Sequence, residues 1–391
     1  MLTTPHGALA TPAFTPVGTL ASVKGLTPQH ISEVGSQAVL ANAYHLYLQP
    51  GADIVDDAGG VGAFMGWAGP TFTDSGGFQV MSLASRAAKV IDMEGDAPQG
   101  TVKRNSRVKI DDDGVTFRSH RDGSSHRFTP EISIGVQHRL GADIMFAFDE
   151  LTTLYDDRRY QDAAVARTHA WAWRCLVEHA RQTQLRVDKP LQSMWGVIQG
   201  AQFQDLRRHA TQGLMELHRR AVDELGRGFG GVGIGGAIQK RNLGQIVGWC
   251  CDELPASMPR HLLGISEPDD IFAGVENGAD TFDCVAPTRI ARHAQIFTRD
   301  GRVRLINARF RNDHGPLDPD SACDAGRTFT RAYLHHLFKA NELLGMTIAT
   351  IVNVAFINQL MADIRAAIDA GDYAAFKDDF LGRYYAGALA K

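Results

Sequence analysis

Short apolar runs, many of them β-branched, recur along the chain as far as Val285, and most of them end in glycine or a polar residue. Apolar runs of this length are typical of strands covered on both faces, as in parallel sheets. The intervals hold sequences with mixed helical faces, such as 162–181 and 206–225. Strands alternating with helices favour a (β/α)8 TIM barrel, although a doubly wound sheet fits the same pattern. The predicted strands are 14–18, 38–42, 71–74, 143–149, 194–199, 231–235, 261–265 and 281–285.

Two segments depart from this alternation. Residues 84–114, after the third strand, are rich in charged residues and glycine and predict an insertion, with a small hairpin through 101–110. Apolar residues at helical spacing from 329 to 369 predict a C-terminal helical subdomain packed on the barrel. We therefore expect a catalytic barrel over 1–300 and a helical subdomain over 301–391.

Composition is that of an ordinary globular chain. The 391 residues are 44% hydrophobic and 21% charged. Apolar runs fall far short of the roughly 18 residues that span a bilayer, and residues 1–13 lack a secretory signal pattern. The five cysteines have an odd count and no disulfide-like spacing, which agrees with a reducing compartment. We expect a cytoplasmic protein without a membrane partner.

Charge is distributed unevenly. The formal net charge of −4 argues against a chain that coats nucleic acid through bulk charge. Between Cys284 and Asn312, however, seven arginines face the single acid Asp300. This local excess indicates a polyanion contact, which would position a nucleic acid rather than read its sequence. A solvated basic face is the alternative. The arginines are Arg289, Arg292, Arg299, Arg302, Arg304, Arg309 and Arg311.

Polar residues stand where most of the predicted strands end. In a TIM barrel these positions converge on one face, where active sites lie. Ordinary turn chemistry also favours Asp, Asn and Gly at strand ends, so a single residue decides little. The strand-end residues are Asn42, Asp74, Asp149, Gln199, Gly235 and Asp283.

Two of these residues are acids in motifs suited to chemistry at a glycosidic bond. Asp74 is the second residue of the run TDSGGFQ, in which glycines permit close approach of a ligand and Phe78 can stack on a planar group. Asp283 lies between apolar neighbours and is expected to be partly desolvated. Two such carboxylates serve as nucleophile and general acid/base. The structural alternatives are an N-cap for Asp74 and an ion pair with Arg289 for Asp283.

Asp149, Gln199 and the glycine run at 233–236 have the groups that a guanine edge needs. A carboxylate accepts from N1–H and the 2-amino group, while amide and backbone N–H groups donate to O6. Phosphate binding is disfavoured, because the glycine run lacks the lysine and hydroxyl of a P-loop and the spacing of a dinucleotide fingerprint.

With these residues, the chain resembles the tRNA-guanine transglycosylases from about Thr11 to Tyr385. The matching motifs are TDSGGFQ at 73–79, FDE at 148–150, FDCV at 282–285, PTR at 287–289 and NARF at 307–310, with support from 119–123 and 331–337.

The resemblance implies a role for each matched residue. Asp283 is the nucleophile that attacks C1′ of the target nucleoside, and Asp74 is the general acid/base for the proton of the incoming base. No metal or nucleotide cofactor takes part. The target must leave its stack to reach a barrel mouth. The base site comprises Ser75, Gly76, Gly77, Phe78, Asp149, Gln199, Gly235, Gly236 and Ala237. The anticodon loop of tRNA binds Gly264, Ile265, Ser266, Glu267, Pro268, Asp269, Asp270, Thr288, Arg289, Ile290, Ala291 and Arg292.

The sequence departs from the family at its structural zinc site. Bacterial and eukaryotic members carry three cysteines and a distant histidine there. One thiol does not make a tetrahedral zinc site, so we predict no zinc and a subdomain held by apolar packing. The residues at the four places are Ser321, Cys323, Gly326 and Val352.

The base pocket departs as well. Leu151 replaces a usual cysteine, and the family's Gly-Gly-Leu-Ala-Val-Gly-Glu becomes GGAIQKR at 235–241. The charge beside the 7-substituent of the incoming base therefore changes, which leaves open the choice between an aminomethyl, a cyano and another 7-deazaguanine. A lysine usual in the anticodon-loop stretch is Glu267 here, and the insertion after the third strand adds a further difference.

The leading prediction is exchange of a guanine in tRNA, at the wobble position of the queuosine pathway, for a 7-deazaguanine. The same exchange on DNA or at another RNA position is the runner-up. A non-catalytic tRNA-binding subunit of a heteromeric transglycosylase is disfavoured by the retained Asp74 and Asp283, and a small-molecule hydrolase by the arginine segment. Phe329, Tyr333 and His336 match a dimer contact of bacterial relatives, so we expect a homodimer.

Overall fold

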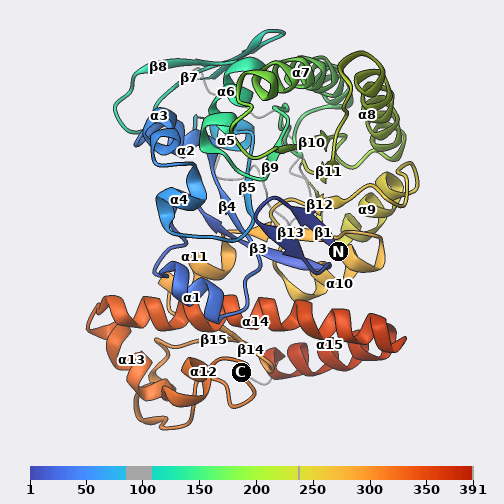
Figure 1. The fold of residues 1–391 in the computed structure, drawn as a ribbon. Coiled ribbons are helices and arrows are strands. Elements are labelled where there is room, and N and C mark those ends of the chain that lie inside the picture. The colour runs from blue at the N-terminus through green and yellow to red at the C-terminus, as the bar shows by residue number, and fades with distance from the viewer. Residues whose placement is uncertain (85–107, 237, 390–391) are drawn as a thin grey trace.

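The fold was analysed in a computed structural model that describes residues 1–84, 108–236 and 238–389. Its centre is a closed barrel of eight parallel strands (Figure 1). In order around the barrel, the strands are β3 (Ala13–Gly18), β4 (Val39–Ala41), β5 (Thr71–Thr73), β9 (Ile144–Phe146), β10 (Ser193–Ile198), β11 (Gly231–Ile234), β12 (Arg260–Leu262) and β13 (Thr281–Cys284), which pairs with β3. The predicted (β/α)8 barrel is confirmed, and the doubly wound sheet is excluded.

Side chains fill the barrel interior, so the barrel is a packed core and not a pore. Phe72, Phe146 and Trp195 are fully or almost fully buried there. The short hairpin of β1 (Leu2–Thr4) and β2 (Gly7–Leu9) adds Leu9 to the same cluster. Every strand of the barrel was predicted to within three residues at each end.

Helices cover the outside of the barrel. Capping residues set their limits: Thr129 accepts from the Ile132 N–H ahead of α6, and glycines with positive φ follow α6 and α8. The covering helices are α1 (Pro28–Glu33), α2 (Ala43–Leu48), α3 (Ala52–Asp57), α4 (Val61–Met65), α5 (Gly77–Ala84), α6 (Pro130–Leu140), α7 (Arg158–Leu185), α8 (Gln204–Leu225), η1 (Lys240–Asn242), α9 (Leu243–Cys251), α10 (Pro268–Glu276) and α11 (Ala286–Arg292).

The insertion after β5 ends in a three-stranded antiparallel sheet of β6 (Val108–Asp111), β7 (Gly114–Arg118) and β8 (Ser125–Phe128). The hairpin predicted over 101–110 lies mostly outside the described residues and stays a prediction, while β6 and β7 form a described hairpin that turns at residues 112–113. Gly114 is required at this turn, because a Cβ there would lie 2.3 Å from the Phe128 carbonyl oxygen. Residues 85–107, including most of the predicted hairpin's first strand, lie outside the described residues.

The C-terminal region begins with the hairpin of β14 (Gln295–Thr298) and β15 (Gly301–Arg304). The remaining elements are η2 (Ala308–Asn312), α12 (Asp324–Thr328), α13 (Arg331–Lys339), α14 (Leu343–Ala370) and α15 (Tyr373–Leu389). In Figure 1 the long α14 runs between the barrel and this hairpin. The predicted helical subdomain is confirmed, while its boundary at residue 300 stays a prediction.

Helix α14 joins the two parts through buried amides as well as apolar contacts. Asn353 accepts from the Phe297 N–H at 2.8 Å and donates to the Pro287 and Gln295 carbonyls. Asn358 donates to the Val34 carbonyl at 2.9 Å. The helix is long and apolar enough to cross a membrane by composition, but 61% of its most apolar window is buried inside the protein.

Candidate active site

The open end of the barrel brings together three acids that lie far apart in the sequence. Asp74 follows β5, Asp149 follows β9 closely, and Asp283 lies in β13. The negative charge of Asp283 contributes to raising the pKa of Asp74, and that of Asp74 contributes to raising the pKa of Asp149. The three carboxyl groups therefore share one electrostatic environment.

Asp74 is held by three donors. Its Oδ2 accepts from Asn42 Nδ2 at 2.5 Å and from Gln79 Nε2 at 2.7 Å, while Oδ1 accepts from the Ala43 N–H at 2.8 Å. Because Ala43 is the first residue of α2, the carboxylate lies at the N-terminus of that helix and does not cap α5, so the N-cap alternative is wrong. Burial outweighs these bonds and raises the pKa of Asp74 to about 6.

Asp283 has one oxygen fixed and one free. Its Oδ1 is 3.0 Å from His261 Nε2 and accepts from the Gly264 N–H at 3.1 Å. The buried His261 is itself fixed by Thr281 Oγ1 at 2.9 Å. Within the described ranges Oδ2 has no partner, and the ion pair with Arg289 offered as an alternative is not formed. Asp283 thus presents Oδ2 to the barrel mouth.

Asp149 lies opposite amide and hydroxyl donors. Its Oδ1 accepts from Ser75 Oγ at 3.1 Å and its Oδ2 from Gln199 Nε2 at 2.6 Å. Burial raises the pKa of Asp149 to about 6, more than these bonds lower it. Ser75 Oγ also accepts from the Gly77 N–H, so the TDSGGFQ turn is tied to Asp149.

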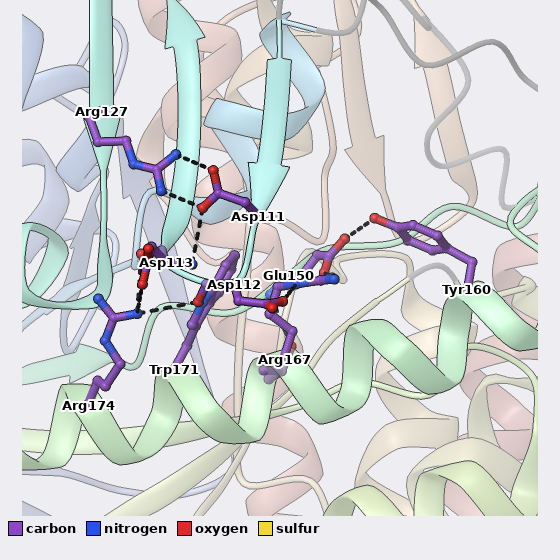
Figure 2. A network of polar contacts seen from close by, with 10 residues as sticks. Asp111, Asp112, Asp113, Arg127, Glu150, Tyr160, Arg167, Trp171 and Arg174 are labelled. Carbon is purple, nitrogen blue, oxygen red and sulfur yellow. Dashed lines mark hydrogen bonds and ion pairs between the residues drawn. The ribbon is translucent and has the colours of Figure 1, made fainter.

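The neighbouring Glu150 is the fully buried centre of a second polar network (Figure 2). Tyr160 and Arg167, both on α7, bond its two carboxylate oxygens. Arg167 continues to Asp112 at 3.2 Å, and Trp171 Nε1 donates to the Asp112 carbonyl at 2.7 Å. The backbone that carries Asp149 is therefore braced by α7, which also holds the β6–β7 turn.

The glycines around the mouth allow this close packing. Gly76 and Gly236 have φ of 81° and 94°, which disfavour other residues. A Cβ at Gly77 would lie 2.9 Å from the Asp149 carbonyl oxygen. Gly235 lies beside the Gln199 amide, whereas Ala237 lies outside the described residues. Phe78 is 43% exposed in the first turn of α5, where a base could stack on it.

Several buried polar atoms at the mouth have no protein partner in the described chain. They are Gln79 Oε1, Gln199 Oε1 and Thr15 Oγ1. Buried polar groups are normally satisfied, so a cluster of unpaired ones beside three carboxyl groups indicates a place for a polar ligand. Asn42 was predicted at this mouth as a strand-end residue, whereas His261, Gln79 and Arg207 were not assigned to the site from sequence, although each is a polar residue in an otherwise apolar pattern.

The twelve residues expected to bind tRNA form two groups beside Asp283. Exposed positions are Gly264, which also donates to Asp283, and Arg289. Glu267 pairs with Arg302, and Lys240 pairs with Asp269 at 3.0 Å. The partly buried or buried remainder comprises Ile265, Ser266, Pro268, Asp270, Thr288, Ile290, Ala291 and Arg292.

Some arginines of the segment 284–312 form ion pairs within the protein, and others lie unpaired on its described surface. Arg299 pairs with Asp363 at 2.5 Å and Arg302 with Glu267, so both have internal counter-ions. Arg302 is nevertheless exposed, as are Arg289, Arg304, Arg309 and Arg311 on the same segment. The local basic surface is thus smaller than the sequence count suggests.

Comparison with known proteins gives one family for the whole chain. The family model described as queuine tRNA-ribosyltransferase matches residues 1–386. The proteins of that name from Pelotomaculum thermopropionicum and Symbiobacterium thermophilum are 43% and 42% identical to this chain. These matches cover 98% and 99% of this chain, and 94% and 88% of the relatives. The chain belongs to the queuine tRNA-ribosyltransferase family. The predicted family and the predicted pentosyltransferase class are both confirmed.

The positions of the family's zinc ligands do not fit a metal in this member. Ser321 Oγ lies 3.4 Å from Cys323 Sγ, and a Cβ at Gly326 would lie only 2.2 Å from that Oγ. Val352 is buried in an apolar cluster against which Cys323 packs. One thiol and one hydroxyl fall short of a tetrahedral N/S set. No cluster of three or more His, Cys, Asp or Glu suited to a metal occurs in the part of the chain that the structure describes.

Proposed function

We propose that this protein exchanges a guanine in tRNA, at the wobble position, for a 7-deazaguanine through a covalent intermediate on Asp283. The observation that carries the proposal is the shared mouth of Asp283 and Asp74, with Asp283 Oδ2 free and Asp74 buried and hydrogen-bonded. The division into nucleophile and proton carrier suits displacement at a glycosidic carbon.

Two displacements complete the exchange. Asp283 Oδ2 forms a bond to C1′ while the bond from C1′ to guanine N9 breaks, and guanine leaves with the electron pair on N9 and takes a proton from solvent water. The incoming base then gives its N9 proton to the Asp74 carboxylate, and N9 attacks C1′ as the bond to Asp283 breaks. Asp74 returns this proton to solvent, which restores its carboxylate for the next turnover. His261 and the Gly264 N–H hold Oδ1 throughout and stabilise the carboxylate as it leaves.

Base recognition follows from the remaining groups of the mouth. The Asp149 carboxylate accepts from N1–H and the 2-amino group, and Gln199 releases its bond to Asp149 to donate to O6. Arg241 stands where the family carries glutamate, so we expect neutral 7-substituents such as cyano to be preferred over the cationic aminomethyl group. Competition between the two bases in the exchange assay checks this, and preference for the cation would contradict it.

Radiolabelled guanine incorporation into tRNA, single-stranded RNA and DNA tests the function. Incorporation into tRNA alone, lost in a variant with the wobble guanine replaced, is the expected result. Incorporation into DNA alone would favour the runner-up, and tight tRNA binding without turnover would favour a non-catalytic subunit. Exchange of the bases of free nucleosides would favour a small-molecule enzyme.

Three further properties are proposed for the purified protein. We expect no stoichiometric zinc by elemental analysis, because Ser321, Gly326 and Val352 provide no usual zinc ligand. We expect a homodimer by light scattering at micromolar concentration, since Phe329 stacks on the partly exposed Tyr333 (ring centroids 5.9 Å apart) beside the exposed His336. A monomer would contradict this. A cytoplasmic location without a membrane partner completes the proposal, and fractionation of cells tests it.

A further inference from the structure

Arg207, in the first turns of α8, is fully buried and has no carboxylate within ion-pair distance among the described residues. Burial lowers the pKa of its guanidinium. The adjacent Cys250 offers no counter-charge, because burial raises the pKa of the thiol. A buried cation without a carboxylate is costly, so its retention calls for a specific reason.

The partners of Arg207 are backbone carbonyls that frame the base-reading residues. Its Nε donates to the Ala201 carbonyl at 2.9 Å, and its Nη1 donates to those of Ile198 at 3.1 Å and Gly235 at 2.8 Å. Ile198 precedes Gln199 at the end of β10, and Gly235 precedes Gly236 at the end of β11. One side chain therefore joins the strand ends that carry two base-reading groups.

The bond to Gly235 fixes the direction of the next N–H. The peptide between Gly235 and Gly236 is trans, since the cis bonds of the described chain precede Pro12 and Pro50. In a trans peptide the C=O and the N–H point in opposite directions. Because the Gly235 carbonyl faces Arg207 on the outer helix layer, the Gly236 N–H faces the barrel mouth.

Arg207 also limits the space around Gln199. A Cβ added at Gly236 would lie 2.6 Å from Gln199 Oε1 and 3.2 Å from Arg207 Nη2, and neither atom has a partner in the described chain. The amide of Gln199 and the peptide of Gly236 are thus packed as one unit against the guanidinium.

We propose that Arg207 is a positioning residue for specificity. It directs the Gly236 N–H toward the O6 atom of a bound 6-oxopurine and holds Gln199 within reach of the same atom. This inference rests on the proposed function and deepens it. In this arrangement, recognition of O6 depends on Arg207 of α8, whereas recognition of N1–H and the 2-amino group depends on Asp149.

Guanine, 6-thioguanine and hypoxanthine test recognition of O6 and recognition of the 2-amino group separately. 6-Thioguanine replaces O6 by a weak acceptor, and hypoxanthine lacks the 2-amino group. Their inhibition constants against guanine exchange would be measured for the wild type, for Arg207→Met and for Arg207→Lys. Arg208→Met is the matched control, because Arg208 is the next residue of α8 and lies partly exposed near Asp252 and Glu253, at 3.5 and 3.6 Å.

For a site built to donate to O6, we expect the wild type to prefer guanine to 6-thioguanine by roughly 10-fold or more. In Arg207→Met the preference for guanine over 6-thioguanine should be about 3-fold or less, as expected when well-oriented hydrogen bonds to O6 are lost. Discrimination against hypoxanthine and the affinity for tRNA should stay within 2-fold of the wild type, roughly the scatter of such measurements. Arg208→Met should behave as the wild type.

An unchanged preference for guanine over 6-thioguanine in folded Arg207→Met overturns the inference, as does an equal loss of discrimination against hypoxanthine. If that variant does not fold, Arg207→Lys decides, because an ammonium keeps the charge but does not bridge the three carbonyls. A wild-type preference in Arg207→Lys then overturns the inference. Absence of guanine exchange in the wild type would instead refute the proposed function.

Discussion

The pH dependence of exchange gives a sharp prediction, because burial raises the pKa of Asp74 to about 6 from 3.8. Asp74 must be a carboxylate to accept the N9 proton of the incoming base. At pH 5 a group with a pKa of 6 is about one-tenth ionised, whereas one with the ordinary pKa is about nine-tenths ionised. The turnover rate at saturating base should therefore fall about tenfold between its plateau and pH 5.

The value of kcat/KM for the base should depend on the titration of a second carboxyl group, that of Asp149. Burial also raises the pKa of Asp149 to about 6, and this carboxylate binds the base. The logarithm of kcat should fall with a slope near one below pH 6, and that of kcat/KM for the base with a slope approaching two, as expected when two interacting groups titrate. Initial rates of radiolabelled guanine incorporation from pH 4.5 to 8 at saturating tRNA provide both profiles.

Gln79→Leu tests the structural cause. The bond from Gln79 lowers the pKa of Asp74, so its removal should move the acid limb of kcat to higher pH. Gln29→Leu is the matched control, because the exposed Gln29 of α1 has Glu33 as its only side-chain hydrogen-bond partner among the described residues. Intrinsic fluorescence over the same range checks that the fold persists. An acid limb near pH 4, or one unmoved by Gln79→Leu, would refute the reasoning.

Stability should respond to pH in the opposite sense. Because the pKa values of Asp74 and Asp149 are raised in the folded state, protonation favours the fold. Their contribution is fully present below about pH 4 and is lost as pH rises through 6. The contribution of these two groups to the free energy of unfolding is thus lowest at the pH where exchange is fastest. Denaturation of the wild type and of Asp149→Asn at pH 5 and 7.5 measures the part contributed by Asp149.

The remaining predictions concern the packing around the base. Gly236→Ala should raise the KM for guanine at least about tenfold and leave the affinity for tRNA unchanged, because its Cβ would lie 2.6 Å from Gln199 Oε1; an unchanged KM would contradict this. Arg167→Met should lower the free energy of unfolding by about 3 kcal/mol or more, since it leaves the buried Glu150 without its cation. Arg174→Met, which breaks a more exposed pair on the same helix, should cost at most about 1 kcal/mol in denaturant unfolding. Equal losses in the two variants would contradict the role of burial.

The barrel could be predicted because most strands are short apolar runs ended by a polar residue or glycine. The run at 71–74, for example, ends in Asp74 and corresponds to β5 (Thr71–Thr73). Asp74 and Asp283 follow from the same pattern, because the carboxyl ends of parallel strands in a closed barrel meet at one mouth whatever their separation in the chain.

Other features depend on contacts between elements that no local pattern encodes. His261 was assigned only to a strand, yet the neighbouring β13 places Thr281 and Asp283 at its two ring nitrogens. Arg207 lies on the buried face of α8, and a charged residue at an apolar position was its only signal. The β6–β7 hairpin was not predicted, because its register is set by the close approach of Gly114 to Phe128.

The central claim is that Asp283 forms the covalent bond to the tRNA. Incubation of the wild type with tRNA in the absence of free base, followed by denaturation and peptide mapping by mass spectrometry, tests it most directly. We predict a ribosyl adduct on the peptide that contains Asp283, and no adduct in Asp283→Asn although this variant still binds tRNA. An adduct on another residue, or one that persists in Asp283→Asn, would contradict the account.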